Sequence, residues 1–237
     1  MNTNHDWLAY DVEEIVKADK NCLWHHLKPH QVFEKQEQMI IVEGNGLMVK
    51  DIRGREYLDA TSGGVWSVMV GYGRDSIADA VCAQMKKMPY FAGVFGTVPA
   101  IKFAQKLLEK LPRMGKVYFS NSGSEANEKA YKIVRQASRI SPKRKGKYKI
   151  MYRDRDYHGT TIGAMSSTGQ AQRKQDFGPF VEGFVEIPHA CCYRCPFDKT
   201  YGNCNIECAR KVEDIILKEG ADSIGALIVE PITAGGG

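Results

Sequence analysis

The stretch KVYFSNSGSEA, residues 116–126, constrains the fold more than any other part of the chain. Its β-branched and aromatic residues at 117–119 predict a short strand, and a helical pattern begins directly after the Ser-Gly-Ser of residues 122–124. Ser122 and Glu125 also fit the S-x-x-E capping box. A strand, a tight turn and a helix N-terminus together present free backbone N–H groups, hydroxyls and the positive end of a helix dipole. The stretch therefore predicts a site for an anion, above all a phosphate.

The chain from residue 116 onward alternates between strand-like and helix-like patterns. Helices are expected at 124–139 and 206–219, and strands at 116–120, 147–152, 184–188 and 224–230. The last of these, IGALIVE, is almost wholly apolar, which is typical of a central strand that is covered on both faces. We therefore predict an α/β fold with a mainly parallel sheet flanked by helices.

The part of the chain before residue 74 has a different pattern. Residues 1–30 are helix-rich, and short strand-like runs separated by glycine-centred turns predict a small antiparallel meander at 39–58. We therefore divide the chain into an N-terminal segment, residues 1–73, and the first part of a large α/β domain, residues 74–237.

Polar and aromatic side chains follow the predicted parallel strands, at the carboxyl edge where open α/β sheets form binding sites. The loop 153–161 carries Tyr157 and His158, and Glu230 ends the last strand. The Tyr157 ring can stack on another aromatic ring. With the predicted phosphate site, this suits a flat, phosphorylated cofactor, and we expect the glycine-rich loop around Trp66 to close over it.

Each of these residues also has a simpler interpretation. Residues 122–124 can be an ordinary capped helix start, Tyr157 a surface aromatic, and Glu230 a carboxylate that only ends a buried strand. The order of the motifs and their βαβ spacing favour the cofactor site for the first two, and they leave both interpretations of Glu230 open.

Five of the seven cysteines gather in one stretch, as Cys191, Cys192, Cys195, Cys204 and Cys208. Their spacing is tolerable for a zinc or iron–sulfur site, so the alternative function is a cysteine-rich metal-binding or redox module. Against a metal, the last two cysteines are separated by three residues at the start of a predicted helix, and no second C-x-x-C is present. We favour reduced thiols and no metal.

Composition narrows the class of protein further. The chain is 43% hydrophobic and 26% charged, and it has no apolar run of about 18 residues that would cross a membrane. Its first residues lack the features of a signal peptide, so we expect a cytoplasmic protein. Much of the net charge of +5 comes from 141–149, which reads as a solvated loop rather than a nucleic-acid site.

These motifs together resemble the class III, or ω-amino acid:pyruvate, family of aminotransferases, which depend on pyridoxal phosphate and have fold type I. The resemblance runs from about residue 7 to the end of the chain. It is carried by DATSGGVWSVMVGYG, SNSGSEANEKAYKIVR, YHGTTIGAMSSTG, CYRCPFDKTYGNCNIECA and VEPITAGGG.

The resemblance implies roles for individual residues. It implies that cofactor binding involves Ser122, Gly123, Ser124, Tyr157, His158 and Glu230. It places Trp66 in the wall of the substrate pocket, and Phe91 and Phe95 in a segment that reaches the active site of a neighbouring subunit. A homodimer or a dimer of dimers with shared active sites is therefore expected.

The resemblance also implies a reaction, in which an ω-amino donor, taurine foremost, gives its amino group to pyruvate and leaves an aldehyde and alanine. In such proteins the Schiff-base lysine lies beyond the position of Gly237. We therefore expect the C-terminal remainder to be missing and the chain alone to be inactive. The sequence does not separate taurine from other ω-amino donors such as β-alanine.

Overall fold

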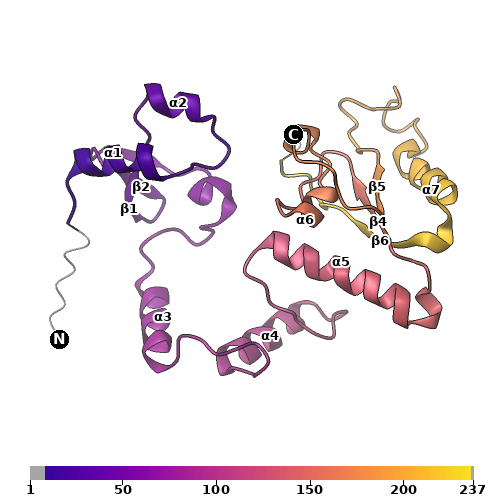
Figure 1. Cartoon of the computed structure of the whole chain (residues 1–237), viewed down its shortest axis with the longest axis horizontal. Helices are drawn as coiled ribbons and strands as arrows, with labels where there is room; N and C mark the ends of the chain where they lie inside the picture. The colour runs from indigo at the N-terminus through magenta and orange to yellow at the C-terminus, as the bar shows by residue number, and fades with distance from the viewer. Residues whose placement is uncertain (1–8, 236–237) are drawn as a thin grey trace. The chain divides into compact units, whose positions relative to one another are not determined.

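The computed structural model describes residues 9–235, and the chain divides into two compact units, Met1–Thr97 and Val98–Gly237 (Figure 1). The ends of the predicted segments, at 1–8 and 236–237, lie outside the described residues. The division by contacts falls after Thr97, whereas the boundary drawn from the sequence falls after residue 73 and stays a prediction.

The first unit contains three α-helices, a π-helical turn at Ser62–Trp66 and a three-stranded sheet in its described part. The helices are α1 (Val12–Cys22), α2 (His30–Lys35) and α3 (Asp75–Lys87), and the strands are β1 (Ile41–Asn45), β2 (Met48–Asp51) and β3 (Glu56–Leu58). The strands pair antiparallel in chain order, which confirms the predicted meander. Asp51 fixes the β2–β3 turn, because its carboxylate accepts hydrogen bonds from the N–H groups of Arg53 and Arg55 and from the hydroxyl of Tyr57.

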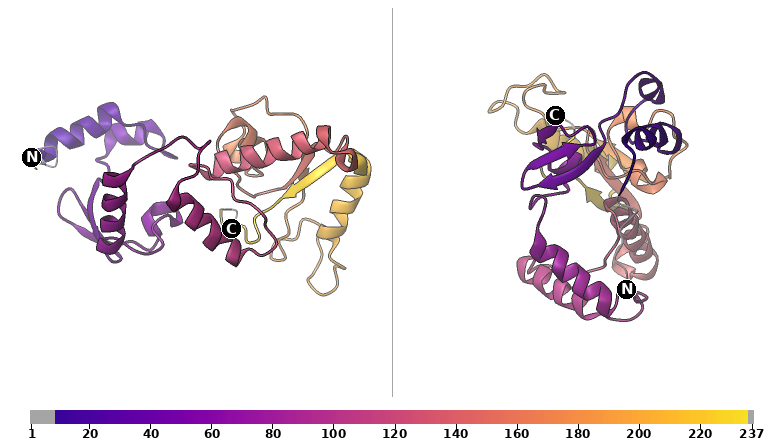
Figure 2. Two further views of the ribbon diagram at one scale, coloured as in Figure 1. Left: turned by 90° about the horizontal axis from the view of Figure 1, so that it is seen from below. Right: turned by 90° about the vertical axis from the view of Figure 1, so that its left-hand side faces the viewer.

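The second unit is an α/β layer structure with a parallel sheet of strand order β5-β4-β6. Its main helices are α4 (Val98–Lys110), α5 (Gly123–Ile140), α6 (Ile162–Ser166) and α7 (Glu207–Glu219), and its strands are β4 (Lys149–Arg153), β5 (Phe184–Ile187) and β6 (Ile224–Ile228). Helix α5 packs against β6 and α6, as Figure 2 shows, and α7 contacts β5. The predicted α/β fold with a parallel sheet is confirmed.

The core of this unit is centred on β4, not on β6. Ile150, Met151 and Tyr152 of β4 are all buried, since β4 has a strand on each side. Within the described residues β6 pairs only with β4 and Leu227 is 50% exposed, so a central place for 224–230 in the sheet of the whole protein stays a prediction. The apolar composition of a strand indicates that both of its faces are buried, but it does not determine the order of the strands in the sheet.

The predicted strand at 116–120 is also not a strand in this structure. These residues have no strand partner among residues 9–235, and the side chains of Tyr118 and Phe119 are exposed. The Phe119 ring instead stacks on Phe103 of α4, with 5.8 Å between ring centroids. A β-strand forms only where a neighbour accepts and donates its backbone hydrogen bonds, and a local pattern of β-branched residues cannot supply that neighbour.

Candidate functional site

The N-terminus of α5 is capped as the sequence predicts. Ser122 is the N-cap residue, and its hydroxyl accepts a hydrogen bond from the Glu125 N–H at 3.2 Å. The Glu125 carboxylate returns to the backbone and accepts from the N–H of Asn121 at 2.9 Å. The two contacts fix where the helix begins, and they leave the next two N–H groups of the first turn unused.

Those two N–H groups belong to Gly123 and Ser124. Within residues 9–235, neither donates a hydrogen bond, and a Cβ added to Gly123 would meet no atom within 4 Å. Two free donors at the positive end of an 18-residue helix, beside open space, form a site that fits an anion.

The loop after β4 comes directly against this helix end. The Thr160 N–H donates to the Ser124 hydroxyl oxygen at 3.1 Å, and the Asn127 amide donates to the His158 carbonyl at 2.6 Å. Gly159 has a φ of +136°, and a Cβ there would lie 2.4 Å from the Ser124 hydroxyl oxygen. Glycine is therefore required where the loop crosses the helix, and the structure brings the two motifs together as predicted.

Tyr157 lies on the exposed side of the same loop. Its ring is 37% exposed, and the Arg173 guanidinium lies over it at 5.0 Å from the centroid. The ring is thus partly accessible, and a partly accessible aromatic ring can stack on a flat aromatic ligand.

His158 is turned inward instead. It is 7% exposed, and within the described residues its buried Nε2 atom has no hydrogen-bond partner. Burial lowers the pKa of His158, an effect that nearby Asp156 opposes and Arg153 reinforces. A buried ring nitrogen without a partner is costly, so Nε2 is an atom that a bound polar group would satisfy.

Asp156 joins this loop to the end of β6. Its carboxylate is fully buried and accepts hydrogen bonds from the Glu230 N–H at 2.8 Å and the Thr233 hydroxyl at 3.1 Å. Arg153 pairs with the same carboxylate at 2.7 Å and donates to the Glu230 carbonyl at 2.6 Å. The Glu230 carboxylate accepts from the Ala234 N–H at 3.3 Å. The carboxyl ends of β4 and β6 are thus fixed to each other by one buried ion pair.

The sequence analysis did not identify Arg153 or Asp156 as part of the site. The signal was present, since RDRD follows the predicted strand directly and charges beside a buried strand need partners. The partners lie 74 and 77 residues further along the chain, so no local pattern names them.

Three of the predicted site residues lie in the first unit, which is described by itself. Trp66 is exposed and has a left-handed backbone conformation, with a φ of +59°. Phe91 and Phe95 are also exposed, and their rings form an edge-to-face pair 5.1 Å apart. Their roles at the substrate pocket and at a neighbouring subunit stay predictions.

The loop that carries Trp66 is held by Asp59. The Asp59 carboxylate accepts hydrogen bonds from the Tyr72 hydroxyl at 2.7 Å, the Gly63 N–H at 2.6 Å and the Thr61 N–H at 2.9 Å. Together these hydrogen bonds hold the pKa of Asp59 well below its usual range, and the bond from Tyr72 makes the largest contribution.

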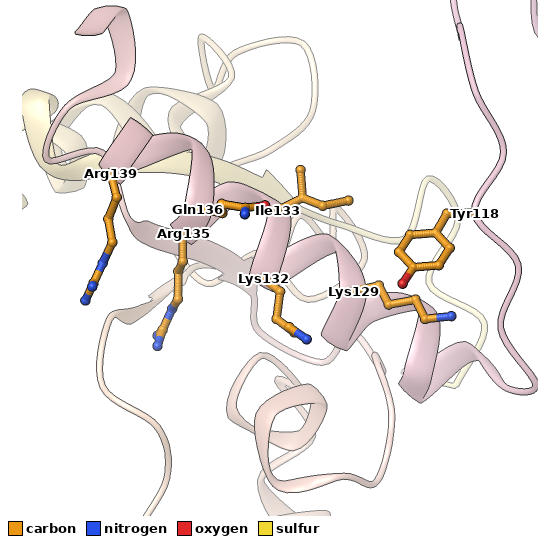
Figure 3. A pocket seen from close by; sticks show the side chains of 7 residues that line it. All are labelled: Tyr118, Lys129, Lys132, Ile133, Arg135, Gln136 and Arg139. Atoms are coloured by element: carbon orange, nitrogen blue, oxygen red, sulfur yellow. The ribbon is translucent and has the colours of Figure 1, made fainter. Parts of the chain in front are cut away.

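A separate basic cavity of about 540 Å³ lies along the outer side of α5 (Figure 3). It is lined by Tyr118, Lys129, Lys132, Ile133, Arg135, Gln136 and Arg139. In Figure 3, Lys132, Arg135 and Arg139 extend from the same side of the helix. Its first lining residue on α5, Lys129, lies about two turns beyond the helix N-terminus, and Tyr118 lines the cavity from the segment before the helix.

All five clustered cysteines are free thiols, and they line one small cavity in the 191–208 segment. Among residues 9–235, no three His, Cys, Asp or Glu side chains are grouped so that they could hold a metal ion. That described part of the chain also contains no helix that is long and apolar enough to cross a membrane.

Comparisons with known proteins agree on one family. The chain matches the model of the family Aminotransferase class-III over residues 31–237. It is 53% identical to the hypotaurine/taurine–pyruvate aminotransferase of Paracoccus denitrificans, over 96% of this chain and 49% of that protein. The chain thus spans about half the length of the curated relatives it matches.

Solved structures agree. An aminotransferase of Bacillus anthracis is 38% identical, with a TM-score of 0.87 over 100% of this chain and 50% of that one. A PLP-bound amine transaminase from an uncultivated Pseudomonas species is 29% identical, with a TM-score of 0.84 over 91% of this chain and 49% of that one. The motif resemblance is confirmed, and the chain belongs to the class III aminotransferase family.

Proposed function

We propose that this chain is the N-terminal half of a pyridoxal-phosphate-dependent aminotransferase. In this proposal the amino donor is an ω-amino compound, with taurine as the first candidate, and the acceptor is pyruvate. The products are an aldehyde and alanine. The observation that carries the proposal is the pair of free N–H groups at Gly123 and Ser124, with the Gly159 loop packed against them. Similarity to taurine–pyruvate aminotransferases supports the choice of donor and acceptor.

The residues of the second unit fit the phosphate and the ring of this cofactor. Gly123 and Ser124 would donate their N–H groups to the phosphate, and the partly exposed Tyr157 would stack on the ring. His158 would support the loop through its carbonyl and present its unpartnered Nε2 to the site. Glu230 would border the site from the end of β6. When bound, the cofactor supplies the carbonyl carbon that takes up and releases the amino group, together with an electron sink.

The lysine that holds such a cofactor covalently is not assigned to any residue of this chain. We propose that sequence following residue 237 supplies it. The support is that the chain spans about half the length of its relatives. The 237 residues alone should therefore bind the phosphate group weakly and catalyse no transamination.

We further propose a cytoplasmic homodimer or dimer of dimers. Trp66 would line the substrate pocket, and Phe91 and Phe95 would reach the active site of the neighbouring subunit. Their exposure on the first unit supports a role in contacts made outside that unit.

The test uses the natural full-length product that contains these residues, purified with pyridoxal phosphate. We expect a visible absorption band that shifts when an amino donor is added, and formation of alanine from pyruvate faster with taurine than with β-alanine. The 237-residue chain, assayed in parallel, should form no alanine. A full-length protein that stays colourless with added cofactor would overturn the aminotransferase proposal. Activity with β-alanine but not taurine would overturn the choice of donor alone.

A further inference from the structure

The cysteine-lined cavity is the most unusual feature that the proposed function does not use. It has a volume of about 30 Å³, which leaves room for about one or two water-sized groups. Its walls are the five cysteines together with Pro196, Phe197, Lys199, Tyr201 and Glu207. The five cysteines thus lie around one small space.

Apart from Glu207 and Cys208 at the start of α7, the backbone around this cavity is held by turns. The hydrogen bonds from Asp198 N–H to the Cys195 carbonyl, Asn203 N–H to the Thr200 carbonyl and Glu207 N–H to the Cys204 carbonyl each join residues three apart. The described part of the segment before α7 contains no strand. A long connection without secondary structure of its own is more often functional than structural.

One pair of thiols has a geometry that allows a covalent bond. Tyr193 and Arg194 form a turn between Cys192 and Cys195. Such a turn keeps the Cα atoms of its first and last residues within about 7 Å, and a disulfide spans Cα atoms about 4.4–6.8 Å apart. Cys192 is exposed and Cys195 is partly buried, so an outside reagent meets Cys192 first.

We propose that Cys192 and Cys195 form a reversible redox pair that reacts with low-molecular-weight disulfides of the glutathione disulfide class. The Cys192 thiolate attacks one sulfur of the reagent, whose S–S bond breaks and releases one glutathione thiolate. The Cys195 thiolate then attacks the Cys192 sulfur and releases the second glutathione. Two protein thiols are oxidised, one glutathione disulfide is reduced, and the two protons from the protein end on the two glutathione thiols.

The small size of the ring favours a reversible role over a structural one. A disulfide stabilises a fold mainly because it closes a long loop of the unfolded chain. A bond across one four-residue turn closes a very short loop and therefore adds little stability. The segment also leaves β5 at Ile187, and the paired register of β4 and β5 places that end at the same sheet edge as the candidate site. Oxidation would thus change a loop that starts from this edge.

The experiment exposes the reduced full chain to glutathione disulfide, blocks remaining thiols by alkylation and digests with trypsin. Trypsin cleaves after Arg194, between the two cysteines, so a disulfide is seen as two peptides that remain linked until dithiothreitol is added. We expect this linked pair, and the loss of two thiols per chain beyond any that carry a glutathione adduct. The exposed, isolated Cys82 should carry such an adduct.

Matched variants assign the bond. Cys191→Ser should leave the linked peptides intact, Cys192→Ser should abolish them, and Cys195→Ser should leave Cys192 as a stable glutathione adduct. Two results would overturn the proposal. One is a wild-type chain in which Cys192 accumulates the adduct without resolution. The other is a purified chain that retains one zinc ion per molecule, with Cys192 and Cys195 unreactive until a chelator removes it.

Discussion

Two loops of this molecule are each organised by one aspartate, but the two aspartates gather their partners in opposite ways. Asp59 binds groups that lie 2, 4 and 13 residues further along the same loop, and the loop remains exposed. Asp156 is fully buried and binds groups 74 and 77 residues away, at the end of another strand. Asp59 thus shapes its loop through groups that lie near it in sequence, and Tyr72 also exchanges two backbone hydrogen bonds with Gly46. The contacts of Asp156 exist only when the parallel sheet has formed.

The largest effect is expected from Asp156→Ala. The change leaves the Arg153 guanidinium largely buried without its carboxylate, which costs about 3–5 kcal/mol in the free energy of unfolding. Asp154→Ala is the matched control, because Asp154 also faces an arginine, at 3.9 Å, but both side chains are over 40% exposed. The control should cost about 1 kcal/mol or less. Urea denaturation of both variants measures the difference, and equal losses would contradict the special role of Asp156.

Gly159→Ala should come next. The added Cβ would meet the Ser124 hydroxyl oxygen at 2.4 Å in a left-handed backbone, so we expect a loss of about 1–3 kcal/mol. Gly64→Ala in the Asp59 loop is the control, because Gly64 has a φ of +92° but nothing within 4 Å of the added atom. It should cost only the backbone strain, about 1 kcal/mol. Equal losses in denaturation would show that the Gly159 loop is not packed against the helix.

The buried loop should also respond to acid. Burial lowers the pKa of His158, while unfolded histidine has a pKa of about 6.5. Above about pH 6.5 the ring is neutral in both states, and its contribution to stability is complete. As the pH falls from there toward the lower folded pKa, the unfolded state binds the proton first, so the free energy of unfolding decreases. His158→Asn should make this decrease shallower in denaturation curves measured between about pH 7 and pH 5, and an unchanged slope would contradict the assignment.

The smallest effect on the whole molecule is expected from Asp59→Asn. The neutral amide weakens the bonds from Tyr72, Gly63 and Thr61, but all of these lie in one exposed loop. Hydrogen exchange at the Gly63 and Thr61 N–H groups should accelerate, while the denaturation midpoint changes little. A large shift of the midpoint would mean that this loop supports more than itself.

The same contrast explains what the sequence could predict. The helix at 124–139 and the cap at Ser122 were found because their signals are local: an apolar repeat and a serine three residues before a glutamate. The Asp59 loop is likewise marked by its own glycines. Other features depend on residues far along the chain, so local patterns in a single sequence do not predict them. These features are the order of the strands, the absence of a strand partner for 116–120 within the described residues and the partners of Asp156.

The predicted site residues follow this rule as well. The Tyr157–Gly159 loop contacts the start of α5 as the order of the motifs predicted, although residues 116–120 form no strand in the described part of the chain. The cation over Tyr157 and the unpartnered nitrogen of His158 were not foreseen, since both depend on packing against distant segments.

The central claim is that the first turn of α5 receives the cofactor phosphate, and Gly123→Asp tests it most directly. An aspartate in the first turn suits the helix dipole, and its Cβ meets no atom within 4 Å, so stability of the cofactor-free protein should stay equal or rise by about 0.3–1 kcal/mol. Its carboxylate would occupy the phosphate position, so the phosphate would lose its charge-assisted hydrogen bonds to the helix N–H groups. Such bonds are worth about 1.5–3 kcal/mol, so pyridoxal phosphate should bind roughly tenfold more weakly or worse. Gly123→Ala is the control for size, and pyridoxal without phosphate is the control for the ring. In equilibrium dialysis of the full-length protein, we predict weaker binding of the phosphorylated form alone. Equal affinity of wild type and Gly123→Asp for pyridoxal phosphate would contradict the account.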